Sequence, residues 1–353
     1  MADCNRARLE STGALDTGRE PSSSSSFLWR QHLPYLTSAL STLPKPYVHA
    51  DTSRITLAYF AATALYLIKQ PQTLDKTKII NWVYAMQLKP TRDQNVPPER
   101  LAGFRAGPFM GNKFSHDGTS SSSQFDTAHL AMTYAALAIL TLLGDDLKGV
   151  DRDRTLAFVR SMQNDDGSFR AYSGGESDMR FLYCAAAICA LLGDDEFVGI
   201  DVRRATDYVL SCRGYDGGVG LDVGQESHGG ATYTALAALS IMETLHELPH
   251  PERCIRWCVE RQVRGFQGRP NKDEDTCYSF WIGASLDLLG APSVTNAVEV
   301  HKFVRACEGS HGGFAKLIGS YPDLLHTFYA LCGMSLVEVE GLESLDSRLG
   351  IIA

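Results

Sequence analysis

The sequence of 353 residues lacks the features that would place it in several common classes of protein. No stretch approaches the roughly 18 uninterrupted apolar residues of a membrane span, and the first residues show neither the basic start nor the apolar run of a secretory signal. Positive charge is not in excess, since the formal net charge is −8, which argues against nucleic acid as the main partner. We therefore expect a cytoplasmic protein with no membrane span and no nucleic-acid partner.

Two chemical signatures are missing as well. The nine cysteines are odd in number and scattered, and no two of them form a Cys-x-x-Cys pair, so the sequence offers no structural zinc site of that kind. In a long chain without an export signal they are expected to be reduced thiols. Asp-x-Asp-Asp runs are also absent, and the Gly-Asp-Asp segments at 144–146 and 193–195 are typical of loops after helices.

What the sequence does contain is a repeat with a period near fifty residues. A glycine-rich turn recurs at 166–169, 216–219, 265–268 and 312–314, and a helix-like apolar segment follows each turn. Aromatic residues lie in the first half of these segments at intervals of 49, 50, 48 and 48 residues: Tyr134, Tyr183, Tyr233, Trp281 and Tyr329. The pattern predicts an all-α fold of stacked helix pairs.

The same pattern leaves two questions open. The helix pairs can close into an α/α barrel or stack as an open superhelix, and a helical-repeat scaffold without chemistry fits the architecture equally well. We expect a disordered N-terminal tail over 1–26, which ends in a serine run, and one folded domain over 27–353. An apolar segment at 52–68 has helical spacing and predicts a helix that Asp51 or Thr52 caps.

One segment carries the residue types of a metal site. Asp275 and Cys277 stand at the start of one repeat's apolar helix, and His326 follows Cys277 by 49 residues, one period of the repeat. Corresponding positions of adjacent repeats lie side by side, so the three side chains are expected to converge. Carboxylate, thiolate and imidazole all bind Zn²⁺, and three protein ligands leave the fourth position open, as in catalytic zinc sites. The alternative for His326 alone is a hydrogen-bonded core histidine.

Cations and a further histidine gather around this segment. Arg269 and Lys272 lie just before it, and His228 begins the apolar helix one repeat earlier. These side chains are suited to the oxygens of a diphosphate, although a solvated charged face is the usual role of such a pair. Zinc beside a diphosphate site and an aromatic cavity indicates activation of a thiol, loss of diphosphate and burial of an apolar tail.

At these residues the sequence resembles the β subunits of protein prenyltransferases. Four motifs carry the resemblance: Gly-Arg-Pro-Asn-Lys-x-x-Asp-x-Cys-Tyr-Ser-Phe-Trp (268–281), Glu-Ser-His-Gly-Gly (226–230), Asp-Met-Arg-Phe-Leu-Tyr-Cys (178–184) and Pro-Asp-Leu-Leu-His (322–326). The resemblance implies an aromatic-lined α/α barrel (toroid), a catalytic Zn²⁺ and an obligate α subunit in a heterodimer. It also implies transfer of an isoprenoid to C-terminal CaaX-motif proteins such as small GTPases.

The resemblance also assigns roles by position. It makes Asp275, Cys277 and His326 the zinc ligands. The implied diphosphate contacts are His228, Arg269, Lys272 and Tyr278, and Arg180, Tyr183 and Trp281 belong to the substrate cavity. Lys316 stands where the farnesyl enzyme has an Asp that helps to hold Mg²⁺, and its ammonium can neutralise the leaving group directly.

The type of lipid is implied by a few further positions. Thr56 stands where the farnesyl enzyme has a bulky Trp, which leaves room for a 20-carbon chain. The pattern from Thr52 to Phe60, together with Leu325, fits the CaaX geranylgeranyl type, whose lipid substrate is geranylgeranyl diphosphate. Tyr329 departs from that type, so farnesyl transfer remains an alternative. A terpene-cyclase-like enzyme on a similar barrel is a further alternative, but it needs an Asp-rich motif and no Cys ligand.

Overall fold

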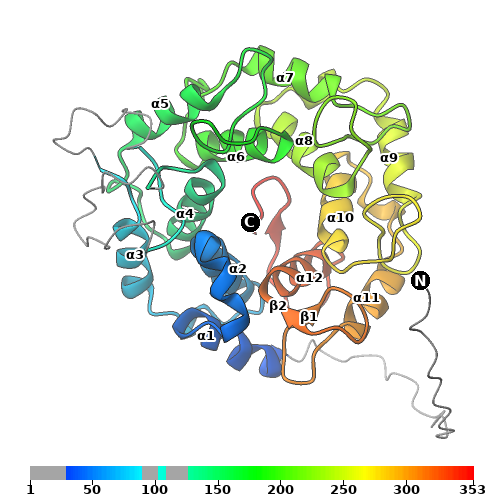
Figure 1. The fold of residues 1–353 in the computed structure, drawn as a ribbon. Coiled ribbons are helices and arrows are strands. Elements are labelled where there is room, and N and C mark those ends of the chain that lie inside the picture. The colour runs from blue at the N-terminus through cyan, green and yellow to red at the C-terminus, as the bar shows by residue number, and fades with distance from the viewer. Residues whose placement is uncertain (1–28, 90–101, 109–125) are drawn as a thin grey trace, which may run out of the picture.

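The computed structural model describes residues 29–89, 102–108 and 126–353, and the regular secondary structure in these ranges is almost entirely helical. The expected tail at 1–26 lies outside the described residues. Helices form two concentric rings (Figure 1). The inner ring consists of α2 (Arg54–Leu67), α4 (Leu130–Leu143), α6 (Met179–Leu191), α8 (Gly229–Ile241), α10 (Tyr278–Leu288) and α12 (Leu324–Leu336). The outer ring consists of α1 (His32–Ser41), α3 (Lys76–Ala85), α5 (Arg152–Met162), α7 (Val202–Ser211), α9 (Pro251–Val259) and α11 (Ala297–Ala306).

The inner ring is closed. Each inner helix packs against its two neighbours in the ring, and the last, α12, packs against the first, α2. On the outside, His32 at the start of α1 accepts a hydrogen bond from Gly313 N–H (3.0 Å) and stacks on Phe314. The predicted all-α barrel of helix pairs is therefore confirmed, and the open superhelix is excluded.

The periodic aromatic residues all lie on inner helices and contact one another in sequence order. Ring centroids are 5.6 Å apart from Tyr134 to Tyr183 and from Tyr183 to Tyr233. Trp281 continues the series 5.1 Å from Tyr233 and 4.2 Å from Tyr329. Tyr59 of α2, 5.7 Å from Tyr134, completes it, and the pattern missed this residue because it precedes Tyr134 by 75 positions rather than one period.

Side chains at one rim of the barrel cap the inner helices. Backbone N–H groups at the starts of α4, α6, α8 and α12 donate to the side chains of His129, Asp178, His228 and Asp323. At the corresponding place, Asp275 accepts the N–H of Cys277, the residue just before α10. Such bonds satisfy donors that have no partner inside the helix. The expected cap of the first inner helix is wrong. A 3₁₀ stretch, Lys45–Ser53, precedes α2, Ser53 takes the N-cap position, and the Asp51 carboxylate binds Arg54 instead.

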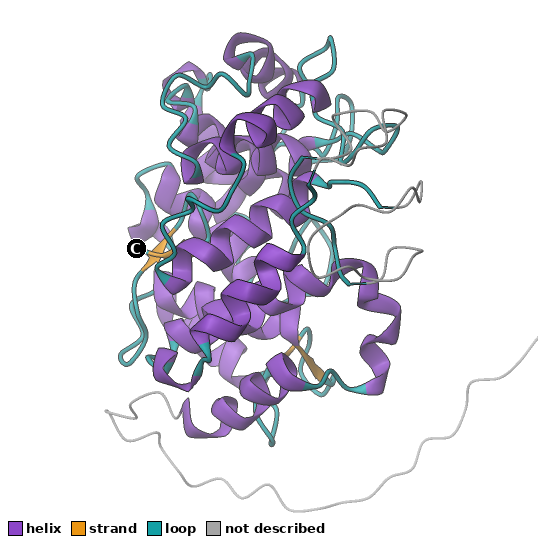
Figure 2. Ribbon diagram, turned by 90° about the vertical axis from the view of Figure 1, so that its left-hand side faces the viewer, coloured by secondary structure: helices purple, strands orange, loops and turns teal. Residues whose placement is uncertain are grey.

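The opposite end of the barrel carries the C-terminus. Two short strands, β3 (Leu345–Asp346) and β4 (Ile351–Ile352), form a hairpin that lies in the middle of the ring and near one end of the barrel (Figures 1 and 2). A second two-stranded ladder pairs β1 (Phe314–Ala315) with β2 (Pro322–Asp323) just before α12. Among the described helices none combines the length and apolarity that a membrane span requires.

Glycine turns set the spacing between adjacent repeats. Gly167, Gly217 and Gly312 have φ values of 92°, 102° and 92°, in the left-handed region that favours glycine. A Cβ on Gly312 would lie 2.2 Å from the carbonyl oxygen of Gln31, and one on Gly167 would lie 2.1 Å from that of Arg204. The last repeat therefore packs against the first through a close contact between a glycine and a backbone carbonyl, as neighbouring repeats do elsewhere in the ring.

We expect Gly312→Ala to lower the free energy of unfolding by about 2 kcal/mol or more, because it adds a backbone clash to the penalty for a positive φ. Gly319→Ala is the matched control, since Gly319 has a φ of 82° with nothing within 4 Å of an added Cβ. Thermal or urea unfolding of both variants measures the difference. Equal losses in the two variants would show that the contact with Gln31 does not hold the ring closed.

Candidate metal and substrate site

An aromatic cavity of about 260 Å³ lies inside the barrel. All six inner helices contribute to its wall, and five of the predicted site residues line it: Thr56, Phe60, Arg180, Tyr183 and Trp281. The Thr56 hydroxyl contacts Met132 Sδ at 3.4 Å, so this wall between α2 and α4 is built from small and flexible side chains. Thr52 and Leu325 are exposed and are not among the residues that line the cavity.

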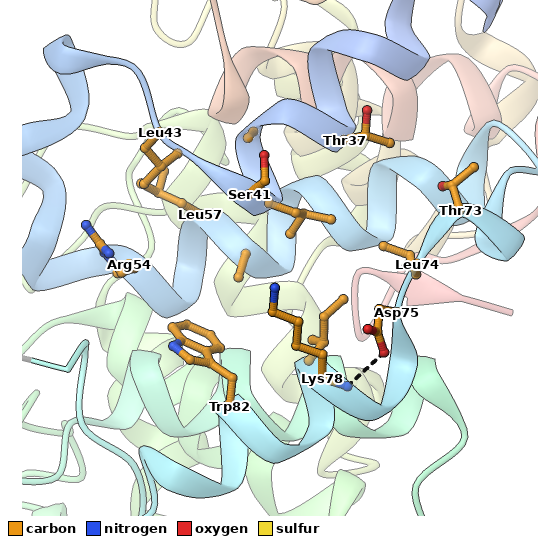
Figure 3. Close-up of a pocket in the computed structure, with 14 residues that line it drawn as sticks. Thr37, Ser41, Leu43, Arg54, Leu57, Thr73, Leu74, Asp75, Lys78 and Trp82 are labelled. Atoms are coloured by element: carbon orange, nitrogen blue, oxygen red, sulfur yellow. Dashed lines mark hydrogen bonds between the residues drawn. The ribbon is translucent and has the colours of Figure 1, made fainter. Parts of the chain in front are cut away.

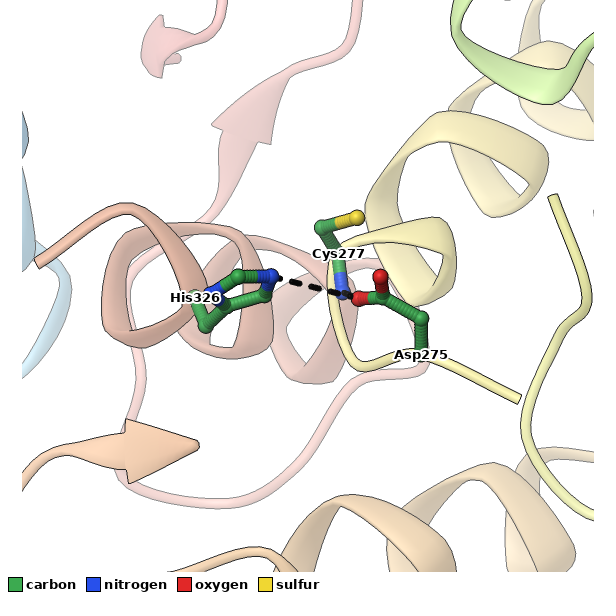
Figure 4. Close-up of side chains that lie close together, drawn as sticks. All are labelled: Asp275, Cys277 and His326. Carbon is green, nitrogen blue, oxygen red and sulfur yellow. Dashed lines mark hydrogen bonds and ion pairs between the residues drawn. The ribbon is translucent and has the colours of Figure 1, made fainter. Parts of the chain in front are cut away.

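At the capped rim, Asp275, Cys277 and His326 converge (Figure 4). One potential ligand atom from each of them lies within 4.8 Å of the others, and His326 Nε2 lies 3.5 Å from Asp275 Oδ1. Asp275 and Cys277 are 6% and 7% exposed. The donor set of one oxygen, one sulfur and one nitrogen fits three positions of a tetrahedral zinc site.

The repeat explains the convergence, but with a different register from the expected one. Asp275 accepts the N–H of Cys277 just before α10, as Asp323 accepts the N–H of His326 at the start of α12, so these two carboxylates are the corresponding residues. Cys277 therefore lies two residues after Asp275, whereas His326 lies three residues after Asp323. The interval of 49 between them is close to the period without marking equivalent positions.

Asp323 controls the orientation of His326. Its Oδ1 accepts the backbone N–H of His326 at 2.9 Å, and its Oδ2 lies 2.6 Å from His326 Nδ1. A carboxylate next to Nδ1 keeps the proton on that nitrogen, which directs Nε2 towards Asp275 and Cys277. Asp323 belongs to the Pro-Asp-Leu-Leu-His motif, and an Asp three residues before a His at a helix start is the sequence signal for this role.

The charges of the three residues depend on one another. Burial opposes ionisation of both Asp275 and His326. The hydrogen bond to His326 helps to outweigh burial and lowers the pKa of Asp275. The hydrogen bonds to Asp275 and Asp323 likewise outweigh burial and raise the pKa of His326 to about 9. Burial and the Asp275 carboxylate raise the pKa of the Cys277 thiol. The protonated His326 thus supplies the positive charge that this acidic cluster attracts, and a divalent cation would suit the same field.

Cationic and hydrogen-bonding groups lie next to the cluster. Lys316 Nζ is 3.7 Å from Asp275 Oδ2, and His228 Nε2 is 2.9 Å from the Tyr278 hydroxyl. Arg269 donates to Glu226 at 2.7 Å, a partner that was not predicted although Glu226 begins the Glu-Ser-His-Gly-Gly motif.

Two features bear on an anion at this place. Lys272 is exposed on the same loop as Arg269. Burial, followed by the Arg269 cation, lowers the pKa of His228. The neutral imidazole of His228 caps α8, whose free N–H groups and dipole favour an anion at the helix start.

A second hollow, of about 380 Å³, lies on the outer side of the barrel between α1, α2 and α3 (Figure 3). Leu57 and Trp82 contribute apolar walls, and Arg54 and Lys78 contribute cations. None of the predicted site residues is among those that line it, so it is separate from the metal cluster.

Comparisons with known proteins agree on one family. The family described as "Prenyltransferase alpha-alpha toroid domain" matches residues 27–351. The chain is 39% identical over 345 residues to the geranylgeranyl transferase type-1 subunit beta of Arabidopsis thaliana, which covers 94% of this chain and 91% of that protein. The protein of the same name from Dictyostelium discoideum is 34% identical over 90% of this chain and 93% of its own length. A solved structure, Candida albicans protein geranylgeranyltransferase-I complexed with GGPP, has the same fold with a TM-score of 0.79, at 23% identity over 93% of this chain and 96% of that chain.

The cap residue His129 predicts an acid sensitivity of the fold. Burial, followed by the Arg180 cation, lowers the pKa of His129 to about 4, so the neutral form that caps α4 is stable above pH 6.5. In the folded chain this neutral form persists down to about pH 4, whereas the unfolded chain already binds the proton below pH 6.5. Stability is therefore lost as the pH falls, by about 2 kcal/mol at pH 5.

His129→Asn keeps an oxygen acceptor at the cap and removes this titration. We expect its melting temperature to fall less between pH 7 and 5 than that of the wild type. The exposed His311→Asn serves as the control. If the wild type and His129→Asn lose the same stability over this range, His129 is not buried as the neutral imidazole.

Proposed function

The chain belongs to the prenyltransferase α/α-toroid family, and we propose that it is the catalytic β subunit of a type-1 protein geranylgeranyltransferase. It transfers a geranylgeranyl group from geranylgeranyl diphosphate to the cysteine of C-terminal CaaX motifs. The observation that carries this function is the cluster of Asp275, Cys277 and His326 at the open rim of an aromatic cavity, with cations beside it. The similarity to two type-1 β subunits over nine-tenths of the chain supports the choice of lipid and acceptor.

The cofactor in this proposal is Zn²⁺, with Asp275, Cys277 and His326 as its ligands. Support comes from the donor set, from its burial, and from Asp323, which holds the His326 ring with Nε2 towards the other two side chains. Bound there, Zn²⁺ keeps an incoming substrate thiol ionised near neutral pH.

The residues around the cluster bind and neutralise the leaving group. Arg269, Lys272, His228 and Tyr278 hold the diphosphate oxygens, and Lys316 places an ammonium at the edge of the same site. Arg269 is bound to Glu226 in this structure, so it exchanges a carboxylate for a phosphate oxygen when the lipid enters. As the bond between the thiol sulfur and C1 of the isoprenoid forms, the bond between C1 and oxygen breaks, and diphosphate leaves.

The apolar tail lies in the aromatic cavity. Tyr183 and Trp281 present ring faces to it, and Thr56 leaves space in the wall. This places the reactive end of the lipid at the capped rim, next to the metal ligands, and its tail towards the closed end of the barrel.

Two partners complete the proposal. One is a prenyltransferase α subunit, since the relatives are named as subunits, and the other is a CaaX-motif protein such as a small GTPase. The heterodimer works in the cytoplasm, where such acceptors are made.

Farnesyl transfer is the second candidate, and a specific observation favours it. Tyr329 lines the cavity with its ring 5.7 Å from Phe60 and 4.2 Å from Trp281, so its hydroxyl occupies space that a longer lipid would need. The terpene-cyclase-like alternative loses support, because a buried Cys277 beside Asp275 and His326 has no use in it.

The function is tested by co-expressing the chain with a prenyltransferase α subunit. We expect about one zinc per heterodimer by elemental analysis, and faster transfer to a CaaX peptide from geranylgeranyl than from farnesyl diphosphate. Cys277→Ala should remove most of the metal, because it takes away the softest ligand, and Cys307→Ala is the control at another buried thiol. Unchanged zinc in Cys277→Ala would overturn the metal site, and no transfer from either lipid by the wild type would overturn the function.

Thr56→Trp tests the lipid assignment. An indole at this wall fills space that the longer chain uses, so we expect the preference to shift towards farnesyl diphosphate by exclusion rather than by new attraction. Overpacking typically costs about 1–3 kcal/mol, so some loss of thermal stability should accompany the shift. The measurement is competition between the two diphosphates. A wild type that prefers the 15-carbon lipid, or a ratio unchanged in the variant, would contradict the geranylgeranyl assignment while leaving prenyl transfer intact.

A further inference from the structure

Five side chains accept backbone N–H groups at the capped rim, and the residue after each of them reaches the next repeat around the ring. These rim acceptors are His129, Asp178, His228, Asp275 and Asp323. After the first four, the N–H of the following residue donates to a backbone carbonyl in the loop before the next inner helix. The pairs, at 2.9–3.1 Å, are Leu130 with Ala171, Met179 with Leu221, Gly229 with Gly268, and Thr276 with Lys316.

After the fifth rim acceptor the partner is a side chain. Leu324 N–H donates to the Tyr47 hydroxyl at 2.9 Å, and Leu324 is buried. The repeat that follows α12 around the ring is the first one, which leads into α2 through the 3₁₀ stretch Lys45–Ser53. This stretch contains no glycine, and its Tyr47 takes the place that a loop carbonyl has in the other repeats.

The Tyr47 hydroxyl is suited to act as an acceptor at this place. Burial raises the pKa of Tyr47, so the hydroxyl keeps its proton near neutral pH and accepts through a lone pair. The Tyr35 hydroxyl of α1 lies next to it and next to the Thr327 hydroxyl. Thr327 in turn donates to the Asp323 carbonyl at 2.6 Å and accepts Phe314 N–H at 2.9 Å. Two tyrosines that precede α2 therefore meet the first turn of α12.

This bond lies on the histidine side of the metal cluster. Leu324 directly follows Asp323 and precedes His326 by two residues, so all three lie within the cap and first turn of α12. Asp323 fixes the direction of the His326 ring only if the backbone from which both side chains extend stays in place. Without the Tyr47 hydroxyl, the buried Leu324 N–H would have no acceptor, which favours a shift or local opening of this turn.

The other side of the cluster is held by main-chain acceptors instead. Thr276, which lies between the other two proposed ligands, donates its N–H to the Lys316 carbonyl at 3.1 Å and its hydroxyl to the Ala315 carbonyl at 2.8 Å. Both acceptors are main-chain atoms, so they remain whatever side chains these positions carry. The histidine side depends instead on the hydroxyl oxygen of Tyr47, which precedes Leu324 by 277 residues.

We propose that Tyr47 is a positioning residue of the metal site, whose hydroxyl acts through Leu324 N–H to keep Asp323 and His326 in the geometry that binds Zn²⁺. This rests on the proposed function, because it takes Zn²⁺ as the occupant of the cluster. Removal of a group that holds a metal ligand in place typically lowers metal affinity by about 10- to 100-fold. Tyr47 is further from the metal than such a group, so its effect is expected at the lower end of this range.

The zinc affinity of the α-subunit complex tests this role, measured by competition with a chromogenic chelator. Tyr47→Phe keeps the ring and removes the acceptor, and it should lower the affinity for zinc about tenfold. Tyr84→Phe is the matched control, since Tyr84 of α3 is also half-buried and its hydroxyl donates to Asp145 at 2.6 Å. The control should bind zinc as the wild type does. A merely structural role of Tyr47 would lower the melting temperature of the zinc-free complex in both variants and leave their zinc affinities equal.

Hydrogen exchange in the wild-type complex gives a second test, which does not depend on the folding of a variant. Coupling between two sites is reciprocal, so zinc that fixes His326 should also fix the segment that holds it. We expect zinc to slow exchange several-fold in 45–53 and to leave exchange in 76–85 unchanged. Equal zinc affinities in Tyr47→Phe and Tyr84→Phe, or exchange in 45–53 that zinc does not change, would overturn the role of Tyr47. A wild-type complex that binds no zinc would overturn the metal site of the proposed function instead.

Discussion

The structure depends on how the starts of its inner helices are satisfied. Each inner helix begins at the same rim, where its first N–H groups have no partner within the helix, and the side chains that accept them recur with the period of the repeat. His129, Asp178, His228 and Asp323 serve this purpose, and Asp275 accepts the N–H of Cys277 just before α10. A ring of polar acceptors around the mouth of an apolar barrel is the consequence. Function uses the same ring. Asp275 Oδ1 accepts the N–H of Cys277 just before α10 and also faces His326 Nε2. Asp323 caps α12 through Oδ1 and orients the His326 ring through Oδ2.

The two ends of the barrel therefore differ in the polarity of the groups that line them. At the capped rim, helix dipoles, Lys316 and Arg269 favour an anion, and the acidic cluster beside them favours a cation. Further inside, the hydroxyls of Tyr59 and Tyr134 donate to the carbonyls of Gly350 and Leu349 in the C-terminal hairpin, and aromatic rings make up much of the cavity wall. A substrate with a charged head and a long apolar tail has one orientation in such a space, which fixes where its reactive carbon lies.

The sequence patterns predicted features that recurring side chains form, and they missed contacts that depend on backbone atoms. The aromatic intervals gave the helix pairs, and the near-period between Cys277 and His326 was sufficient to bring the metal cluster together, because an error of one residue at a helix start moves a side chain by only a few ångströms. Closure of the ring could not be predicted, since it rests on the approach of Gly312 to a carbonyl of Gln31. Asp323 and Glu226 were visible in motifs, but their roles required the geometry.

The central claim is that one carboxylate, one thiolate and one imidazole, brought together by adjacent helix starts, form a zinc site with an open position. X-ray absorption at the zinc edge of the purified heterodimer tests it most directly. The account predicts a single sulfur neighbour near 2.3 Å, with nitrogen and oxygen neighbours near 2.0–2.2 Å, and a second sulfur neighbour when a CaaX peptide is added. A zinc surrounded only by nitrogen and oxygen, or a spectrum that the peptide does not change, would contradict it.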